Sequence, residues 1–214
     1  MHKTITLFGK AAPLFFFLLL TGISSKSYAQ CAGEDASTTS CDKETNQFID
    51  LFAALNGSPV TGGTWSDDNN SGGLNGTTGE LNTWLINRGG TFNYTYTVED
   101  IADCTDNQAT VTVTLAGYAG RDNNDGVACE TENDVNLFQF VGSSPSPTLF
   151  GTWAITVGPA NALNGQIFNA QQAGPGNYTF TYTVASQGSC PSTMSTVMVE
   201  VIEAPDSGSI DNTV

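Results

Sequence analysis

Cysteine is the residue of this chain whose type and spacing could do chemistry. The five cysteines in 214 residues are Cys31, Cys41, Cys104, Cys129 and Cys190. Four of them form pairs of similar spacing, with 63 residues from Cys41 to Cys104 and 61 from Cys129 to Cys190. In an oxidising compartment each such pair forms a disulfide worth about 4 kcal/mol in the chain-entropy account. We therefore predict these two bridges, with swapped connectivity as the alternative.

Cys31 is the odd cysteine. It closely follows an apolar N-terminal run, so lipid attachment is one interpretation, although Gln30 stands where a lipoprotein site wants a small residue. A bond to another molecule and a free thiol near the N-terminus are the other two. The sequence leaves all three open.

The carboxylates could form two kinds of site, a calcium-binding site or the active site of a glycosidase. In the turn from Asp122 to Gly126, Asp122 and Asp125 could give oxygen ligands to calcium, although the spacing is not that of an EF-hand. The turn at residues 67–70 has less pattern still, and solvated turns are the simpler interpretation of both. A glycosidase needs only two carboxylates, but no pair is singled out. Calcium is thus the one cofactor considered.

Other catalytic chemistry is excluded by residue type. The single histidine, His2, lies in a predicted leader, so the mature chain has no imidazole for a Ser-His-Asp or Cys-His site. Lys43 is the one lysine beyond the leader, and no phosphate-binding glycine loop ends at it. We expect a protein that is not an enzyme.

The first 29 residues have the order of a signal peptide: Lys3 and Lys10, an apolar run at 14–20, and Ser27-Tyr28-Ala29. We predict cleavage after Ala29 and export to the cell surface or the medium. The apolar run is shorter than the roughly 20 residues that span a bilayer, and no later segment approaches that length. We therefore expect no transmembrane anchor in the mature chain.

The mature chain is strongly acidic. Three basic residues, against all 21 acidic ones, follow Gln30. Such a surface repels phosphate backbones and anionic lipid. Nucleic acid is therefore excluded as a partner, while surface glycans and proteins remain.

The chain contains two copies of one unit. Cys41 matches Cys129 at an offset of 88 residues, and Cys104 matches Cys190 at 86. Between them Gly-Thr-Trp, Leu-Asn-Gly and an aromatic Thr-Tyr-Thr-Val segment recur in the same order. We predict repeats at 30–116 and 117–203. Because Ala204-Pro205-Asp206-Ser207-Gly208 resembles the lead of each repeat, residues 204–214 begin a truncated third repeat or form a tail.

The periodicity within each unit is that of β-strands. Apolar and polar residues alternate over 91–98 and again over 178–184, so one face of each strand is buried. Residues 110–115 and 197–201 alternate in the same way. Residues 47–55 and 135–141 fit a helix or a strand, and their aromatic content favours a strand. Dense glycine turns between such strands predict an all-β protein of two antiparallel sandwiches.

A cysteine, a tryptophan and a second cysteine per unit suggest an immunoglobulin-like core. Because Cys104 and Cys190 follow the Thr-Tyr-Thr-Val strand, the predicted bridges staple a loop rather than cross the core. Four aromatic residues are predicted to be core: Trp65, Trp153, Tyr96 and Tyr182. Carbohydrate stacking is the alternative for the two tryptophans.

The order of these motifs over residues 32–203 resembles the Ig-like or PKD-like tandem repeats of large secreted Bacteroidota surface proteins. Such proteins are described as gliding-motility-associated or adhesin-like, and many carry a C-terminal sorting domain for type IX secretion. That domain is missing here, which implies a truncated product or one retained in the periplasm. The resemblance implies a non-catalytic spacer or adhesin, with a lectin-like module as the alternative.

Overall fold

The computed structural model describes residues 29–99, 101–102, 104–142 and 144–205. The predicted signal peptide, apart from Ala29, and residues 206–214 of the predicted third repeat lie outside the described residues. The described chain is mostly β-strand, and each of its five helical segments has three or four residues. Among the described residues no helix has the length and apolar character needed to cross a bilayer.

The N-terminal half forms one four-stranded sheet with two small sheets beside it. The main sheet has the order β2 (Ala36–Ser40), β8 (Gln108–Leu115), β6 (Gly90–Thr97), β4 (Thr64–Asp67). The smaller sheets are β3 (Phe48–Asp50) with β5 (Glu80–Asn82), and β1 (Ala29–Gln30) with β7 (Cys104–Asp106). The helical segments are α1 (Leu51–Ala54) and a 3-10 turn (Thr83–Leu85).

The C-terminal half repeats this arrangement. Its main sheet has the order β9 (Asn123–Cys129), β15 (Thr193–Ile202), β14 (Gly176–Val184), β11 (Thr152–Val157). A smaller sheet joins β10 (Val135–Asn136), β13 (Ile167–Phe168) and β12 (Leu163–Asn164). The helical segments are α2 (Ala170–Ala173) and two 3-10 turns (Leu137–Phe140 and Ala160–Ala162). We call the residues before Gly117 the first unit and those from Gly117 on the second unit.

The structure confirms that each of the strands predicted from alternation buries one face. On β6 the side chains of Phe92, Tyr94 and Tyr96 are buried, and β14 buries the matching face. One apolar cluster lies among residues 32–115 and another among residues 128–201. Each main sheet therefore packs its own core.

Two expectations about strands were wrong in part. The first strand of each unit pairs in parallel with the last, β2 with β8 and β9 with β15, so the sheets are not wholly antiparallel. Apolar alternation is the same for either direction, which is why the sequence could not decide it. Residues 47–55 and 135–141 begin as short strands and then turn into helix, because Asp50 and Asn136 cap those turns with their side chains.

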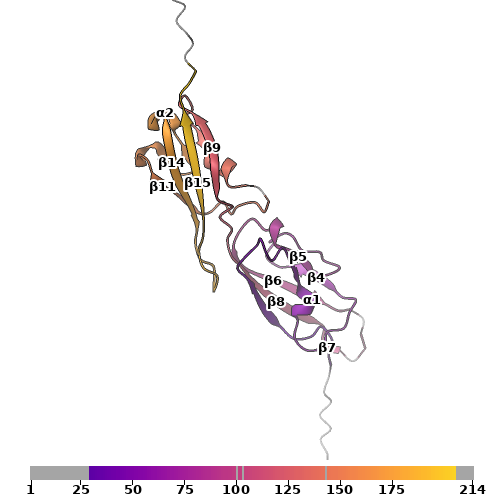
Figure 1. Ribbon diagram of the computed structural model, residues 1–214. Helices are drawn as coiled ribbons and strands as arrows, with labels where there is room; N and C mark the ends of the chain where they lie inside the picture. The colour runs from indigo at the N-terminus through magenta and orange to yellow at the C-terminus, as the bar shows by residue number, and fades with distance from the viewer. Residues whose placement is uncertain (1–28, 100, 103, 143, 206–214) are drawn as a thin grey trace, which may run out of the picture.

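The two main sheets lie end to end (Figure 1), the first unit in indigo to magenta and the second in rose-red to yellow. The strand β7 lies at one extreme of the molecule, and the end of β15 lies at the other. The chain passes between the units once, after Leu115 and before Asn123. This passage and the hairpin loop between β14 and β15 meet where the units adjoin.

Candidate functional site

The two disulfides differ from the predicted pairs. Cys41 is bonded to Cys190 and Cys31 to Cys104, whereas Cys129 forms no bridge among the described residues. The predicted pairs Cys41–Cys104 and Cys129–Cys190 are therefore wrong, and swapped connectivity is present in one bridge alone, Cys41–Cys190, since Cys104 pairs with Cys31. The lipid-attachment interpretation of Cys31 fails as well, because its sulfur is used in the bridge.

The parallel pairing of the first and last strands explains the exchange. Cys41 follows β2 at the end where Ser40 lies beside Leu115, whereas Cys104 precedes the other end of β8. At about 3.3 Å per residue, the length of β8 holds these cysteines roughly 25 Å apart. A disulfide requires Cα atoms within about 7 Å, so the two cannot meet. The same geometry separates Cys129 from Cys190, on either side of β15.

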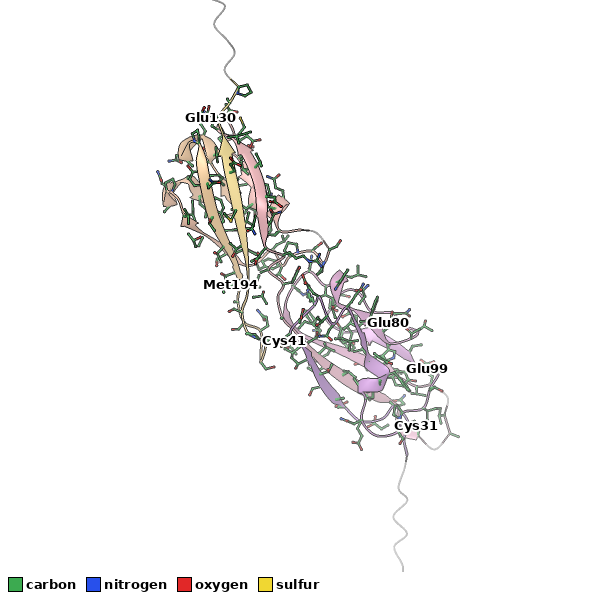
Figure 2. The ribbon with its side chains drawn as sticks, viewed as in Figure 1. Cys31, Cys41, Glu80, Glu99, Glu130 and Met194 are labelled. Carbon is green, nitrogen blue, oxygen red and sulfur yellow. A yellow bond between two sulfur atoms is a disulfide. The ribbon has the colours of Figure 1, made fainter. Side chains whose placement is uncertain are left out.

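The Cys41–Cys190 bridge joins the two units. Cys190 lies in the loop between β14 and β15, in a tight turn closed by reciprocal backbone hydrogen bonds with Gln187. This loop packs on the first unit, since a Cβ on Gly188 would lie 3.0 Å from the Cγ2 of Thr114. Cys190 itself is buried. In Figure 2 Cys41 and Met194, the latter near the start of β15, are labelled where the two units adjoin.

Polar side chains hold the passage between the units against the second sheet. The hydroxyls of Thr193 and Ser195 donate to the carbonyls of Gly117 and Ala119, at 3.0 and 2.8 Å. Thr148 adds two bonds to the backbone of Tyr118. The backbone of residues 117–119 is thereby fixed to the second unit.

Two side chains of this passage reach back to the first unit. The Tyr118 hydroxyl donates to Oε1 of Glu44 at 2.5 Å, and Nε of Arg121 donates to the same oxygen at 2.8 Å. The bond from Tyr118, followed by that from Arg121, holds the pKa of Glu44 below its ordinary value. Burial and the bond to Glu44 raise the pKa of Tyr118 to about 12. Glu44 is thus an ionised acceptor shared by two residues of the second unit.

A cavity of about 400 Å³ lies beside this contact, lined by residues 41–44, 117–122 and Thr193–Met194. Its charged groups are already engaged. Lys43 is buried, donates to the carbonyl of Ile86, and has its pKa lowered to about 8 by burial. Asp122 accepts from the Thr196 amide at 2.7 Å. This arrangement joins two folded units, and we take it as the candidate functional site.

The predicted core aromatics form equivalent clusters in the two units. Trp65 lies against Tyr96 at 5.0 Å between ring centroids, and Trp153 against Tyr182 at 4.8 Å. Trp65, Tyr96 and Tyr182 are buried, whereas Trp153 is partly exposed and its buried Nε1 has no hydrogen-bond partner among the residues that the structure describes. A cavity of about 250 Å³ adjoins each tryptophan.

A tyrosine hydroxyl explains the repeated Gly-Thr-Trp motif. Tyr96 accepts from the amide of Gly63 at 2.8 Å and donates to the carbonyl of Val60, and Tyr182 does the same with Gly151 and Thr148. A Cβ on Gly63 would lie 2.7 Å from the Tyr96 ring, and one on Gly151 2.6 Å from that of Tyr182. Only glycine fits at this approach.

The calcium prediction at Asp122 and Asp125 stays a prediction. Asp122 binds the Thr196 amide, as Asp35 binds that of Thr110 at 2.8 Å in the first unit. Within residues 29–205, excluding the three that the structure does not describe, no three His, Cys, Asp or Glu side chains are grouped as metal ligands. The repeated aspartate therefore has a structural role that does not need a metal.

Sequence reasoning missed Glu44, Tyr118 and Arg121. Glu44 follows Cys41 by three residues as Glu132 follows Cys129, and that match was the available signal. The contact of Glu44 with Tyr118 and Arg121 forms only because the two units lie end to end, and periodicity within one unit does not reveal that arrangement.

Comparisons with known proteins give little further guidance. No protein-family model matches the chain, and no curated protein matches it. Among solved structures, a crystal structure of Drosophila N-cadherin EC1-3 is similar at 10% identity and a TM-score of 0.31, over 80% of this chain and 65% of that one. Drosophila N-cadherin EC1-4 is similar at 13% identity and a TM-score of 0.24, over 80% and 48%. The chain thus spans less than two thirds of either structure, and similarity at this level carries no functional argument.

Proposed function

We propose that this chain is a non-catalytic, exported surface module in which two tandem immunoglobulin-like domains, residues 30–116 and 117–203, act as a spacer. One observation carries the proposal: the Cys41–Cys190 bridge joins the two units and does not lie within the core of either one. A spacer has to hold its parts at a fixed separation. A covalent bond at the junction serves that purpose directly.

Three further features support a fixed junction. The passage between the units is bonded to the second sheet by Thr193 and Ser195. Tyr118 and Arg121 reach from it to Glu44 of the first unit. Disulfides also persist in oxidising compartments, which agrees with an exported protein at the cell surface or in the medium.

Small-angle X-ray scattering tests the spacer. We expect the wild-type chain to scatter as one rigid elongated particle, and the variant Cys41→Ser/Cys190→Ser to show a broader range of inter-unit distances. The matched control is Cys31→Ser/Cys104→Ser, which removes a bridge lying within the first unit. A wild-type chain as flexible as the unbridged variant would overturn the proposal.

An adhesive, lectin-like role is the second candidate, favoured by the equivalent cavities beside Trp65 and Trp153. Aromatic faces bordered by polar groups suit sugar rings. A glycan array probed with the wild-type chain and with Trp153→Ala would test it. Binding that the substitution abolishes would establish the lectin. No binding by a folded wild-type chain would leave the spacer alone.

A further inference from the structure

The matched cysteines lie at opposite ends of each unit. Cys41 directly follows, and Cys129 ends, the edge strand that runs parallel to the last strand of the unit. Cys104 and Cys190 both precede that last strand, at its other end. Each unit therefore has one cysteine at its trailing end and one at its leading end.

The observed bridge links the trailing cysteine of one unit to the leading cysteine of the next, Cys41 to Cys190. Cys104 is the leading cysteine of the first unit, and Cys31 takes the place of a trailing partner for it. Cys129 is the trailing cysteine of the second unit and forms no bridge within the described chain. If Cys129 pairs as Cys41 does, its partner is the leading cysteine of a further unit.

A glutamate follows Cys129 by three residues, as it does Cys41. Glu132 stands at the position of Glu44, the residue that binds the next unit, and is exposed. Its Oε2 accepts from the Cys129 amide at 3.0 Å, and the Thr131 hydroxyl lies 3.3 Å from the Cys129 sulfur. Cys129 is partly exposed, and Figure 2 labels the neighbouring Glu130 at the end of the molecule farthest from Cys31. That end of the second unit corresponds to the end of the first unit that the second unit covers.

We propose that Cys129 is a covalent attachment site for a further repeat that follows Pro205. The loop cysteine of that repeat, equivalent to Cys190, forms the disulfide with Cys129. This inference rests on the proposed spacer function. Its evidence is the bond that Cys41 already makes in the matched position. At the offset of 86 residues that relates Cys104 to Cys190, Ile202-Glu203 has the place in sequence that Ala116-Gly117 has at the start of the second unit.

The bond forms by thiol–disulfide exchange. The Cys129 thiol and the incoming loop thiol lose two protons and two electrons in forming one S–S bond. A dithiol–disulfide oxidant of the exporting compartment accepts them, and its own disulfide becomes two thiols. In the experiments below, glutathione disulfide is that oxidant.

A three-unit chain tests the site. Residues 1–202 are followed directly by a second copy of residues 117–205, which keeps the register of the natural junction, because Leu115 beside Ser40 corresponds to Val201 beside Ala128. After oxidation and peptide mapping we expect Cys129 of the first copy to be bonded to the cysteine of the second copy that corresponds to Cys190. The one remaining free thiol should be the second copy of Cys129.

A matched three-unit chain carries serine in place of that added loop cysteine. In this control Cys129 of the first copy should stay reactive to maleimide. If instead the added loop cysteine stays free in the unsubstituted three-unit chain while Cys129 is also free, or if Cys129 bonds elsewhere, the proposal is wrong. Circular dichroism of both chains confirms that the added unit has folded.

A second assay avoids the fusion altogether. In the full chain with Cys31→Ser, the leading Cys104 and the trailing Cys129 are both free, at opposite ends. We expect head-to-tail oligomers longer than dimers, linked by Cys104–Cys129 bonds, in non-reducing gels and mass spectra, and nothing longer than a dimer for Cys31→Ser/Cys129→Ser, whose one free thiol is Cys104. Only monomers, or symmetric Cys129–Cys129 dimers, would overturn the attachment site. Because the scattering experiment does not involve Cys129, the spacer proposal would stand or fall separately.

Discussion

At the scale of single residues, the hydroxyls of Tyr96 and Tyr182 do the same work in the two units. Each accepts from a glycine amide and donates to a carbonyl three residues before that glycine. Gly63 and Gly151 are partly buried. If the tyrosine hydroxyl were removed, water would be a poor substitute as the hydrogen-bond partner of their amides. The repeated motif therefore encodes a hydrogen bond and not only a packed ring.

We expect Tyr96→Phe and Tyr182→Phe each to lower the free energy of unfolding by about 1–3 kcal/mol, because one amide and one carbonyl lose their partner. Urea unfolding followed by fluorescence measures the loss. Thr156→Val is the control, since the Thr156 hydroxyl donates to a carbonyl on the exposed face, and its effect should stay within about 0.5 kcal/mol. Equal stabilities for the Phe variants and the control would contradict this role.

Lys43 predicts a pH dependence. Burial lowers its pKa to about 8, against 10.5 for an ordinary lysine. Between about pH 8 and pH 10 the unfolded chain holds more protons at this group than the folded chain, so Lys43 makes the free energy of unfolding rise with pH. Above that range Tyr94 and Tyr118, each with a pKa raised to about 12, act in the opposite direction.

We expect Lys43→Met to flatten this rise. Urea unfolding at several pH values from about 7 to 10 should show a steeper increase for the wild-type chain than for the variant. Parallel curves would mean that the ammonium is not desolvated as the structure indicates.

At the scale of elements, an aspartate side chain fixes each parallel strand pair. Asp35 stands just before β2 and binds the Thr110 amide on β8, and Asp122 stands just before β9 and binds the Thr196 amide on β15. The bond continues the ladder where the edge strand begins. It sets the register of a strand that, among the described strands, has a partner on one side alone.

Replacing Asp35 or Asp122 with alanine should cost about 1–3 kcal/mol in thermal or urea unfolding, since a charged acceptor is lost. Asparagine at either position keeps an oxygen that can accept the same bond, so Asp→Asn should restore most of the stability. An asparagine variant as unstable as the alanine variant would point to the charge rather than the bond.

Calcium is tested on the same elements. If Asp122 and Asp125 bind the ion, excess calcium should raise the melting temperature of the wild-type chain over that in chelator, because a ligand bound only to the folded state stabilises it. Asp125→Asn, which leaves the bond from Asp122 to Thr196 in place, should then abolish the increase. The same melting temperature with and without calcium would dismiss the prediction.

The sequence was sufficient for the strands that bury one face. Phe92, Tyr94 and Tyr96 alternate so regularly that the buried face of β6 could be predicted. It was insufficient where a side-chain cap competes with strand formation, as Asp50 does at the start of α1. It also could not give strand direction, and the disulfide error followed from that, because Cys41 and Cys104 meet only if β2 runs antiparallel to β8.

At the scale of the whole molecule, Glu44 couples the units electrostatically. Its pKa in the folded chain lies below the ordinary value, so its contribution is present above about pH 4.5 and is lost as the pH falls through the folded-state pKa. The junction, which sequence reasoning did not predict, is therefore weakened by acid.

We expect Glu44→Gln to lower the pH at which Tyr118 ionises, because the carboxylate that helps raise the pKa of that phenol to about 12 is gone. Ultraviolet titration of tyrosinate measures the shift. Glu132→Gln changes the matched residue of the second unit and should leave the titration unaltered. If the two variants titrate alike, the contact of Glu44 with Tyr118 does not form in solution.

The Cys41–Cys190 bridge also decides how the molecule bears a mechanical load. When the two ends are pulled apart, the shortest covalent path enters at Cys41 and leaves at Cys190, so the chain between them, with a sequence separation of 149 residues, carries no tension. At about 3.3–3.6 Å per extended residue, roughly 500 Å of chain is withheld from stretching. Most of both cores lies in that shielded segment, and the load passes through β2 and β15 at its margins. While the Cys41–Cys190 bridge is oxidised, the module is a nearly inextensible link. Once that bridge is reduced, the segment between the two cysteines can unfold and extend under load.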